Sequence, residues 1–327
     1  MPWSEPVSLS PAMLAGVFVS AAAVSALGSA WAIAHAHRND LLDHPGERRS
    51  HEVPTPRGGG IGIVLACLLA MLATAGLGIA PDGWWLAATG LVLVAAIGWW
   101  DDHRPLSPWP RLLVHAIAAA CLAGSIHLQG TGATAVIAAF VLALVLVNAW
   151  NFIDGINGLA ASQAMLCALG FAAVLDDGGR LLALAVAGAS LGFLPFNFPR
   201  AKLFLGDVGS GALGYLVALL LAAGFASQPP TSWPLLLLPV AAILVDTGLT
   251  LLWRIRRGER WWQPHVQHAY QQWSRSLGHA PVTSGYAVFT FVAIMAMLAL
   301  IPVGYGWGVG VVAALLLTCL VGWLRSR

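Results

Sequence analysis

Eleven long apolar stretches divide this chain and restrict the folds that it can adopt. Crossing about 30 Å of hydrocarbon takes about 20 apolar residues, and somewhat fewer suffice for a helix packed among others. Hydrophobic residues make up 58% of the sequence and charged residues 9%, whereas about a quarter of a soluble protein is charged. We therefore expect an all-α, polytopic membrane protein with a single domain over residues 1–327. The stretches lie at about 11–34, 58–80, 84–100, 112–128, 133–150, 158–175, 181–196, 211–226, 234–253, 283–302 and 304–324.

The basic residues predict how the chain is oriented. Loops rich in Lys and Arg stay on the cytoplasmic side of a membrane. Fifteen of the 16 Lys and Arg residues fall in alternate loops or at the carboxyl end, and only Arg180 falls on the other side. We therefore expect a periplasmic amino terminus and a cytoplasmic carboxyl terminus, with the first stretch retained as an anchor. The predicted cytoplasmic loops are about 35–57, 101–111, 197–210 and 254–282.

Several function classes are disfavoured by what the sequence lacks. The four cysteines all lie in apolar stretches without a CxxC or Cys/His spacing, which indicates small buried side chains and neither zinc nor disulfides. No Gly-x-x-x-x-Gly-Lys phosphate loop is present, which argues against an ATP-driven pump. We expect the lipid bilayer as a partner and no nucleic acid.

Five carboxylates sit at or inside the predicted spans. Asp101, Asp102, Asp154 and Asp207 each lie at the cytoplasmic mouth of a span, and Asp246 lies within the ninth. A secondary transporter would also have several spans and intramembrane acids. Transporter acids, however, gather near the bilayer midplane, whereas four of these five gather at one face. An enzyme with its site at the cytoplasmic surface is therefore favoured over a transporter.

Asp101 and Asp102 follow a tryptophan pair in "IGWWDDHRP". Adjacent carboxylates repel each other, so they attract a divalent cation or raise one another's pKa, which suits a general base. The alternative is that they only cap a helix end. His103 and Arg104 follow directly as partners.

Asp207 lies between glycines in "KLFLGDVGSGALG". It could simply cap a helix that begins near Ser210. The flanking glycines, however, let a ligand approach the backbone, and an oxygen ligand at a helix amino terminus can hold Mg²⁺ together with a phosphate. This second interpretation predicts a metal ligand.

Two basic segments are candidate anion sites. His265 and His268 lie three residues apart in "RWWQPHVQHAYQQW", so they could share a helical face. No third metal ligand is adjacent, and hydrogen bonds to a diphosphate fit better. Arg49, His51 and Arg57 precede a triple glycine that opens the second span. That glycine run suits either anion binding or close helix packing.

Polar residues recur every three positions in "VNAWNFIDGINGLA". Asn148, Asn151 and Asp154 would advance slowly around one broad helical face and could line a cytoplasmic cleft. Two acidic and two basic clusters on one side of the membrane describe a phosphoryl-transfer site with a lipidic substrate. Mg²⁺ suits such a site because it binds through one or two carboxylates and substrate phosphates.

Five motifs, in order, resemble those of the polyprenyl-phosphate N-acetylhexosamine-1-phosphate transferases of the glycosyltransferase family 4 type. The resemblance implies transfer of a sugar 1-phosphate from a UDP-N-acetylhexosamine to undecaprenyl phosphate in the bacterial inner membrane, with release of UMP. The motifs are "RSH..PTPRGGG" at 49–60, "DDHR" at 101–104, "NAWNFIDGINGLA" at 148–160, "FLGDVGSGALGY" at 204–215 and "H..HAYQ" at 265–271.

The resemblance also implies roles for single residues. Asp207 and Asp102 would bind Mg²⁺, with Mn²⁺ as the alternative ion, and Asp101 or Asp102 would deprotonate the lipid phosphate or act as nucleophile. Asp154 completes the predicted catalytic set, and a homodimer is the candidate assembly. The predicted substrate-binding residues are Arg49, His51, Arg57, Arg104, Asn148, Asn151, His265 and His268.

Two departures bear on the branch of the family. Many relatives carry an acid where this chain has Asn157. The branch that makes lipid I of peptidoglycan carries a Lys after its Asp pair and three consecutive His in the late loop, whereas this chain has Arg104 and a spaced His pair. We therefore expect the O-antigen initiating type, for FucNAc, QuiNAc or GlcNAc, with a phospho-MurNAc-pentapeptide transferase as the alternative.

Overall fold

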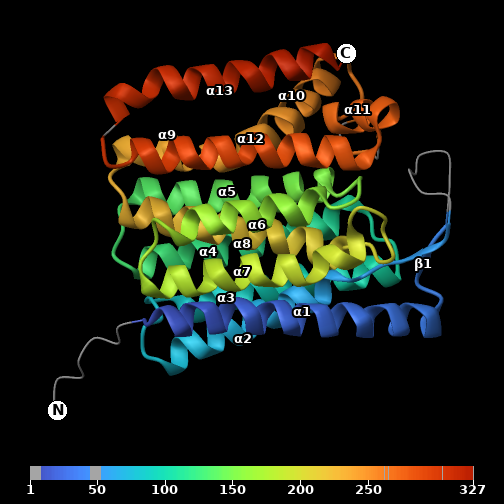
Figure 1. Ribbon diagram of the computed structural model, residues 1–327, viewed down its shortest axis with the longest axis horizontal. Coiled ribbons are helices and arrows are strands. Elements are labelled where there is room, and N and C mark those ends of the chain that lie inside the picture. Colours follow the sequence, from blue (N-terminus) through green and yellow to red (C-terminus); the bar gives the residue numbers. More distant parts are fainter. Residues whose placement is uncertain (1–8, 45–52, 261, 264, 304, 327) are drawn as a thin grey trace.

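Long helices that run alongside one another form the body of the protein in the computed structural model (Figure 1). The structure describes residues 9–44, 53–260, 262, 263, 265–303 and 305–326. The long helices are α1 (Pro11–Asn39), α2 (Gly60–Gly76), α3 (Trp84–His103), α4 (Pro108–Leu128), α5 (Ala133–Ile153), α6 (Leu159–Ala172), α7 (Asp177–Asn197), α8 (Gly206–Ser227), α10 (Ala241–Arg256), α12 (His279–Leu300) and α13 (Tyr305–Arg325).

Short elements complete the described fold. Helix α11 (Ala269–Leu277) lies in the long loop before α12. Strands β1 (Leu42–Asp43) and β2 (Thr55–Pro56) pair antiparallel at the end of the bundle where α11 also lies (Figure 1). The turns η1 (Pro230–Ser232), α9 (Trp233–Leu236) and η2 (Leu238–Val240) precede α10. Prolines at 234 and 239 lack the backbone N–H that a continuous helix needs, which explains why this segment is broken.

Nine described helical segments are long and apolar enough to cross a membrane, with the broken stretch 230–256 counted as one, and α2 and α6 are shorter apolar helices. A multi-pass, all-α membrane protein, as predicted from composition, is therefore confirmed. The nine long and two short helices match the eleven predicted stretches in position. The number of true crossings and the side on which each terminus lies stay predictions.

Helix α8 lies in the middle of the bundle, and α13 and the α1–α2 pair occupy opposite edges (Figure 1). In its most apolar window, 94% of the α8 residues are buried, against 11% for α13. The buried Tyr215 hydroxyl of α8 donates a hydrogen bond to the Ala87 carbonyl of α3 at 3.0 Å. Because the functional motif "FLGDVGSGALGY" opens α8, the site is anchored on the most enclosed element.

The "PRGGG" segment packs against the start of α8. Gly59 and Gly60 donate backbone hydrogen bonds to the carbonyls of Phe204 and Leu205, at 2.9 and 2.8 Å. A Cβ on Gly60 would lie 2.0 Å from the Cα of Gly209. The close-packing interpretation of this glycine run therefore describes its geometry, because only glycine lets α2 and α8 approach so closely.

Candidate active site

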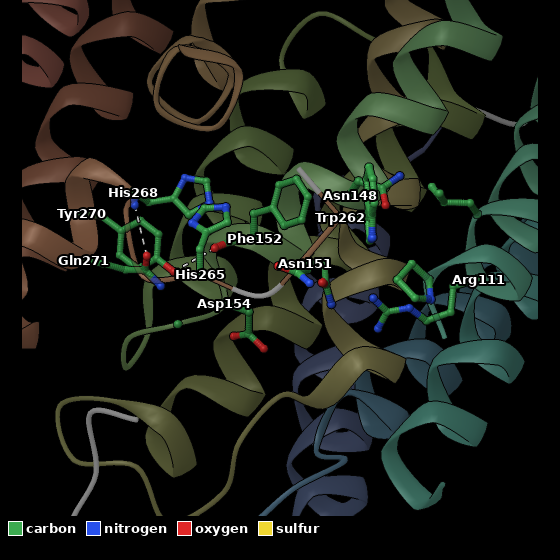
Figure 2. Close-up of a pocket in the computed structure, with 14 residues that line it drawn as sticks. Arg111, Asn148, Asn151, Phe152, Asp154, Trp262, His265, His268, Tyr270 and Gln271 are labelled. Atoms are coloured by element: carbon green, nitrogen blue, oxygen red, sulfur yellow. Dashed lines mark hydrogen bonds between the residues drawn. The ribbon is translucent and has the colours of Figure 1, made fainter. Parts of the chain in front are cut away.

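A cavity of about 350 Å³ opens where α4, α5 and the loop before α11 meet. Figure 2 shows its side chains converging, with Arg111 on one side and Tyr270 and Gln271 on the other. The lining residues are Pro108, Arg111, Leu112, Asn148, Asn151, Phe152, Asp154, Gly155, Trp262, Gln263, His265, His268, Tyr270 and Gln271.

Arg111 holds two carboxylates together at one edge of this cavity. Its Nη1 donates to Oδ2 of Asp101 and, at 2.9 Å, to Oδ2 of Asp207. The Asp101 side chain is 8% exposed, while that of Asp207 is 32% exposed. Asn151 donates to the other Asp207 oxygen at 2.7 Å and lies 3.1 Å from the Ser210 hydroxyl. Residues of α3, α4 and α5 thus converge on Asp207.

Asp102 points away from this cluster and into the start of α8. Its Oδ1 accepts a hydrogen bond from the Asp207 N–H at 3.0 Å, and its Oδ2 accepts one from the Val208 N–H at 3.1 Å. The first N–H groups of a helix have no partner within it. Asp102 therefore caps α8 from the neighbouring helix α3. Helix capping was the alternative role considered for the Asp101–Asp102 pair.

Arg57 binds the end of α3. It donates to the carbonyl of Asp102 from Nε at 2.9 Å and to that of Asp101 from Nη2 at 3.2 Å. Its Nε also lies 3.8 Å from the Asp102 carboxylate. Cations are favourable beside the partly negative carboxyl end of a helix. Arg57 thus holds the Asp pair in place and does not line the cavity.

Helix α8 begins earlier than predicted. It starts at Gly206, not near Ser210, so Asp207 lies in its first turn instead of capping it. Gly206 has φ of +76°, and a Cβ there would lie 2.6 Å from Oδ2 of Asp102. The reversed backbone at Gly206 is what brings the Asp207 and Val208 N–H groups to Asp102.

The end of α5 supplies the cavity with polar groups, as the three-residue spacing predicted. Asn148 and Asn151 both line the cavity, and α5 ends at Ile153 with Asp154 in the next position. Burial raises the pKa of Asp154 well above its usual range, and the negative charges of Asp207 and Asp102 raise it further. Asp154 is thus a carboxyl group whose ionised form lacks a compensating positive charge.

The loop before α11 forms the opposite wall. The His265 and His268 rings lie 4.7 Å apart, centroid to centroid. They do not share a helical face as expected, because residues 265–267 are not helical and α11 begins only at Ala269. The Tyr270 hydroxyl donates to the Phe152 carbonyl at 2.8 Å, which ties this wall to the end of α5.

Other predicted residues lie elsewhere. Arg104 is exposed and borders a separate hollow beside His103 and the Trp99–Trp100 pair. Arg49 and His51 lie outside the described residues. Asn157 donates to the Pro199 carbonyl at 3.0 Å and is not part of the cavity lining. An aspartate at this position could not donate that hydrogen bond.

Sequence reasoning missed Arg111, Trp262, Tyr270 and Gln271 as lining residues. Tyr270 and Gln271 stand within the quoted "H..HAYQ" motif, so the signal for them was present. By its place in the sequence, Arg111 is only one of the basic residues of a predicted cytoplasmic loop. Nothing in its local sequence distinguishes it from the other arginines, and only its contact with Asp207, 96 positions away, does so.

The donors around Asp207 fit Mg²⁺ better than a transition metal. Within the described part of the chain, no three His, Cys, Asp or Glu side chains stand close enough together to hold a metal ion. Mg²⁺ needs no such cage, since it binds through one or two carboxylates and substrate phosphates. Asp207 and Asp101 both contact the Arg111 guanidinium, so this edge of the pocket stabilises positive charge.

Fold and site together define a polytopic membrane protein with a polar, carboxylate-bearing pocket at one end of its helices. The family model for Glycosyl transferase family 4 matches residues 84–224. A decaprenyl-phosphate N-acetylglucosaminephosphotransferase from Mycolicibacterium smegmatis is 30% identical over 86% of this chain and 80% of the relative. The chain belongs to glycosyl transferase family 4, as its motifs predicted.

Two further relatives mark the range of the similarity. A probable undecaprenyl-phosphate N-acetylglucosaminyl 1-phosphate transferase from Bacillus subtilis is 27% identical over 71% of this chain and 69% of the relative. A phospho-N-acetylmuramoyl-pentapeptide-transferase from Heliobacterium modesticaldum is 31% identical over 62% of this chain and 72% of the relative. Two of these three relatives are thus named as phosphotransferases of a polyprenyl phosphate, and the third as a transferase of phospho-N-acetylmuramoyl-pentapeptide.

Proposed function

We propose that this protein transfers N-acetylglucosamine 1-phosphate from UDP-N-acetylglucosamine to undecaprenyl phosphate and releases UMP. The observation that carries the proposal is the pairing of Asp101 and Asp207 through Arg111 at the edge of a pocket whose far wall bears two histidines. The relatives named above as N-acetylglucosamine phosphotransferases favour this sugar. The O-antigen role, and FucNAc or QuiNAc as the sugar, stay predictions.

The chemistry follows from the charges in the pocket. An oxygen of the lipid phosphate attacks the phosphorus that bears the sugar, and the bond between that phosphorus and the UMP oxygen breaks. The bond between sugar C1 and its oxygen is untouched, so the anomeric configuration is retained. Bound Mg²⁺ would neutralise negative charge on the diphosphate and the leaving UMP, with Asp207 as the carboxylate that would hold it.

Asp101 is a better candidate than Asp102 for the base that takes the proton of the lipid phosphate. Both Asp102 oxygens accept hydrogen bonds from the α8 backbone, whereas Asp101 faces Arg111 and Asp207. Arg111 and the histidine wall lie on opposite sides of the pocket (Figure 2), where they can hold the two phosphate-bearing substrates. This arrangement differs from the sequence-based expectation that Asp102 binds the metal.

The test is an assay of purified protein or membranes with Mg²⁺, a polyprenyl phosphate and a panel of UDP-sugars. We expect UMP release with UDP-N-acetylglucosamine, loss of release with EDTA, and recovery with Mg²⁺ or Mn²⁺. Undecaprenyl and decaprenyl phosphate are compared as acceptors, and UDP-MurNAc-pentapeptide tests the alternative activity. The proposal fails if none of the UDP-sugars gives UMP. Product analysis on sealed vesicles whose cytoplasmic face points outward checks on which side of the membrane the reaction occurs.

A further inference from the structure

Asp246 is a buried carboxylate that takes no part in the chemistry described above. It lies in the middle of α10 and is 3% exposed. It does not line the pocket of Figure 2, but it contacts His268 and Tyr270, which do line that pocket. Buried charges inside a membrane helix are costly and therefore call for a role.

The Asp246 carboxylate is surrounded by donors from two neighbouring helices. Its Oδ1 accepts a hydrogen bond from the Ala269 N–H at 2.7 Å, and its Oδ2 accepts one from the Tyr270 N–H at 3.1 Å. The Tyr286 hydroxyl of α12 also donates to Oδ2, at 2.9 Å. Asp246 thus caps the first turn of α11 from outside that helix.

The same carboxylate faces the histidine wall. Oδ1 of Asp246 lies 3.8 Å from Nδ1 of His268, a buried side chain. The N–H groups that Asp246 fixes belong to the two residues directly after His268. Tyr270 in turn reaches the Phe152 carbonyl at the end of α5. Asp246 therefore contacts three consecutive residues of this wall, His268, Ala269 and Tyr270.

We propose that Asp246 is a positioning residue: by capping α11 it fixes His268 and Tyr270 as one wall of the substrate pocket, without touching substrate itself. The expected effect on turnover rests on the proposed function. The structural half of the inference, that Asp246 caps α11, does not. A carboxylate suits this role because its two oxygens can accept from two N–H groups while one of them also lies near the imidazole of His268.

The central variant is Asp246→Asn. Its amide keeps the size of the side chain but offers only one acceptor oxygen, so one of the two α11 N–H groups loses its partner. We expect the KM for UDP-N-acetylglucosamine to rise roughly tenfold. Thr247→Val is the matched control, because Thr247 is a buried neighbour on the same helix that bonds only to the Ile243 carbonyl among the described contacts.

A double variant separates positioning from general destabilisation. If Asp246 acts through His268, then Asp246→Asn adds little to the loss caused by His268→Ala alone. An equal fold-loss in both backgrounds, or a normal KM in Asp246→Asn, would overturn the proposal. If Asp246→Asn does not fold, Tyr286→Phe removes one donor from the carboxylate, and its smaller rise in KM should likewise vanish in the His268→Ala background.

Hydrogen exchange tests the structural half without substrate. Asp246→Asn should speed amide exchange at residues 268–273 and leave α8 unchanged, whereas unchanged exchange at 268–273 would contradict the cap. This measurement needs no turnover. Its failure is therefore distinguishable from failure of the proposed function, which would show as absent UMP release from the unaltered protein.

Discussion

Arg111 is the residue whose importance the structure most changes. It carries the positive charge that lets Asp101 and Asp207 lie side by side. Two carboxylates this close to one another repel, and the guanidinium that contacts both offsets part of that repulsion. Removing one partner of a partly buried ion pair leaves the other charges uncompensated.

Replacing Arg111 should therefore impair the site strongly. We expect Arg111→Met to lower kcat/KM on the order of a hundredfold, and Arg111→Lys to recover part of that loss, since it keeps a charge but not the planar fork. UMP release at fixed Mg²⁺ measures both. Arg256→Met is the control, because Arg256 is exposed and outside the pocket lining; an equal loss in the control would show that bulk charge is responsible.

Asp154 makes a prediction about pH. Its pKa in the folded protein is raised, so its ionisation costs stability: the folded state is favoured below the ordinary carboxyl pKa, and that advantage is lost as the pH rises toward the raised value. In the absence of metal, the thermal midpoint of Asp154→Asn minus that of the unaltered protein should increase as the pH increases from about 4. A difference that does not depend on pH would contradict the raised pKa.

At the scale of elements, the site depends on how α2, α3 and α8 meet. Gly206 lies where the chain reverses into α8, and the Asp102 carboxylate occupies the space beside it. The acidic motif of α3 and the glycine-rich motif of α8 therefore pack against each other and form one joint between the two helices. The short helix α11 is attached to the bundle in a similar way, by Asp246.

Gly206→Ala should break that joint. The positive φ strains any side chain, and the added methyl group meets the Asp102 carboxylate, so we expect a loss of about 2 kcal/mol or more in the free energy of unfolding. Thermal unfolding in detergent measures the change. Gly285→Ala in α12 is the matched control, since a Cβ there meets nothing within 4 Å, and equal loss in both variants would rule out this joint as the cause.

At the scale of the whole molecule, one end of the helix bundle collects the chemistry. The carboxyl ends of α3 and α5 meet the amino ends of α4 and α8 around Asp207. This is the clustering that argued against a transporter, and the family membership agrees with an enzyme. The predicted orientation places this end of the bundle in the cytoplasm.

Labelling in intact cells tests the orientation. In a background lacking the four native cysteines, Asp82→Cys should react with a membrane-impermeant maleimide added outside, whereas Ser276→Cys should react only after permeabilisation. Both positions are exposed, and they lie in loops predicted to face opposite sides of the membrane. The reverse pattern would overturn the orientation, and labelling of both from outside would indicate a wrong number of crossings.

Most of the fold could be predicted from the sequence, because membrane helices are specified by the length and polarity of local stretches. The alternation of loops then places residues 101, 154 and 207 at the same end without any knowledge of packing. Residue types also predicted Asn148, Asn151, Asp154, His265 and His268 as neighbours, and the structure brings these five together around one pocket.

Only the tertiary structure decided which role each residue has at the end of the bundle that bears the site. Asp101 and Asp102 are adjacent and chemically identical, yet one faces Arg111 and the other caps α8, because successive residues of a helix point in different directions toward different neighbours. Arg57, Arg111 and Asp246 acquire their roles from partners 10 to 96 positions away. Local sequence fixes what a side chain can do, and packing between distant segments fixes which partner it meets.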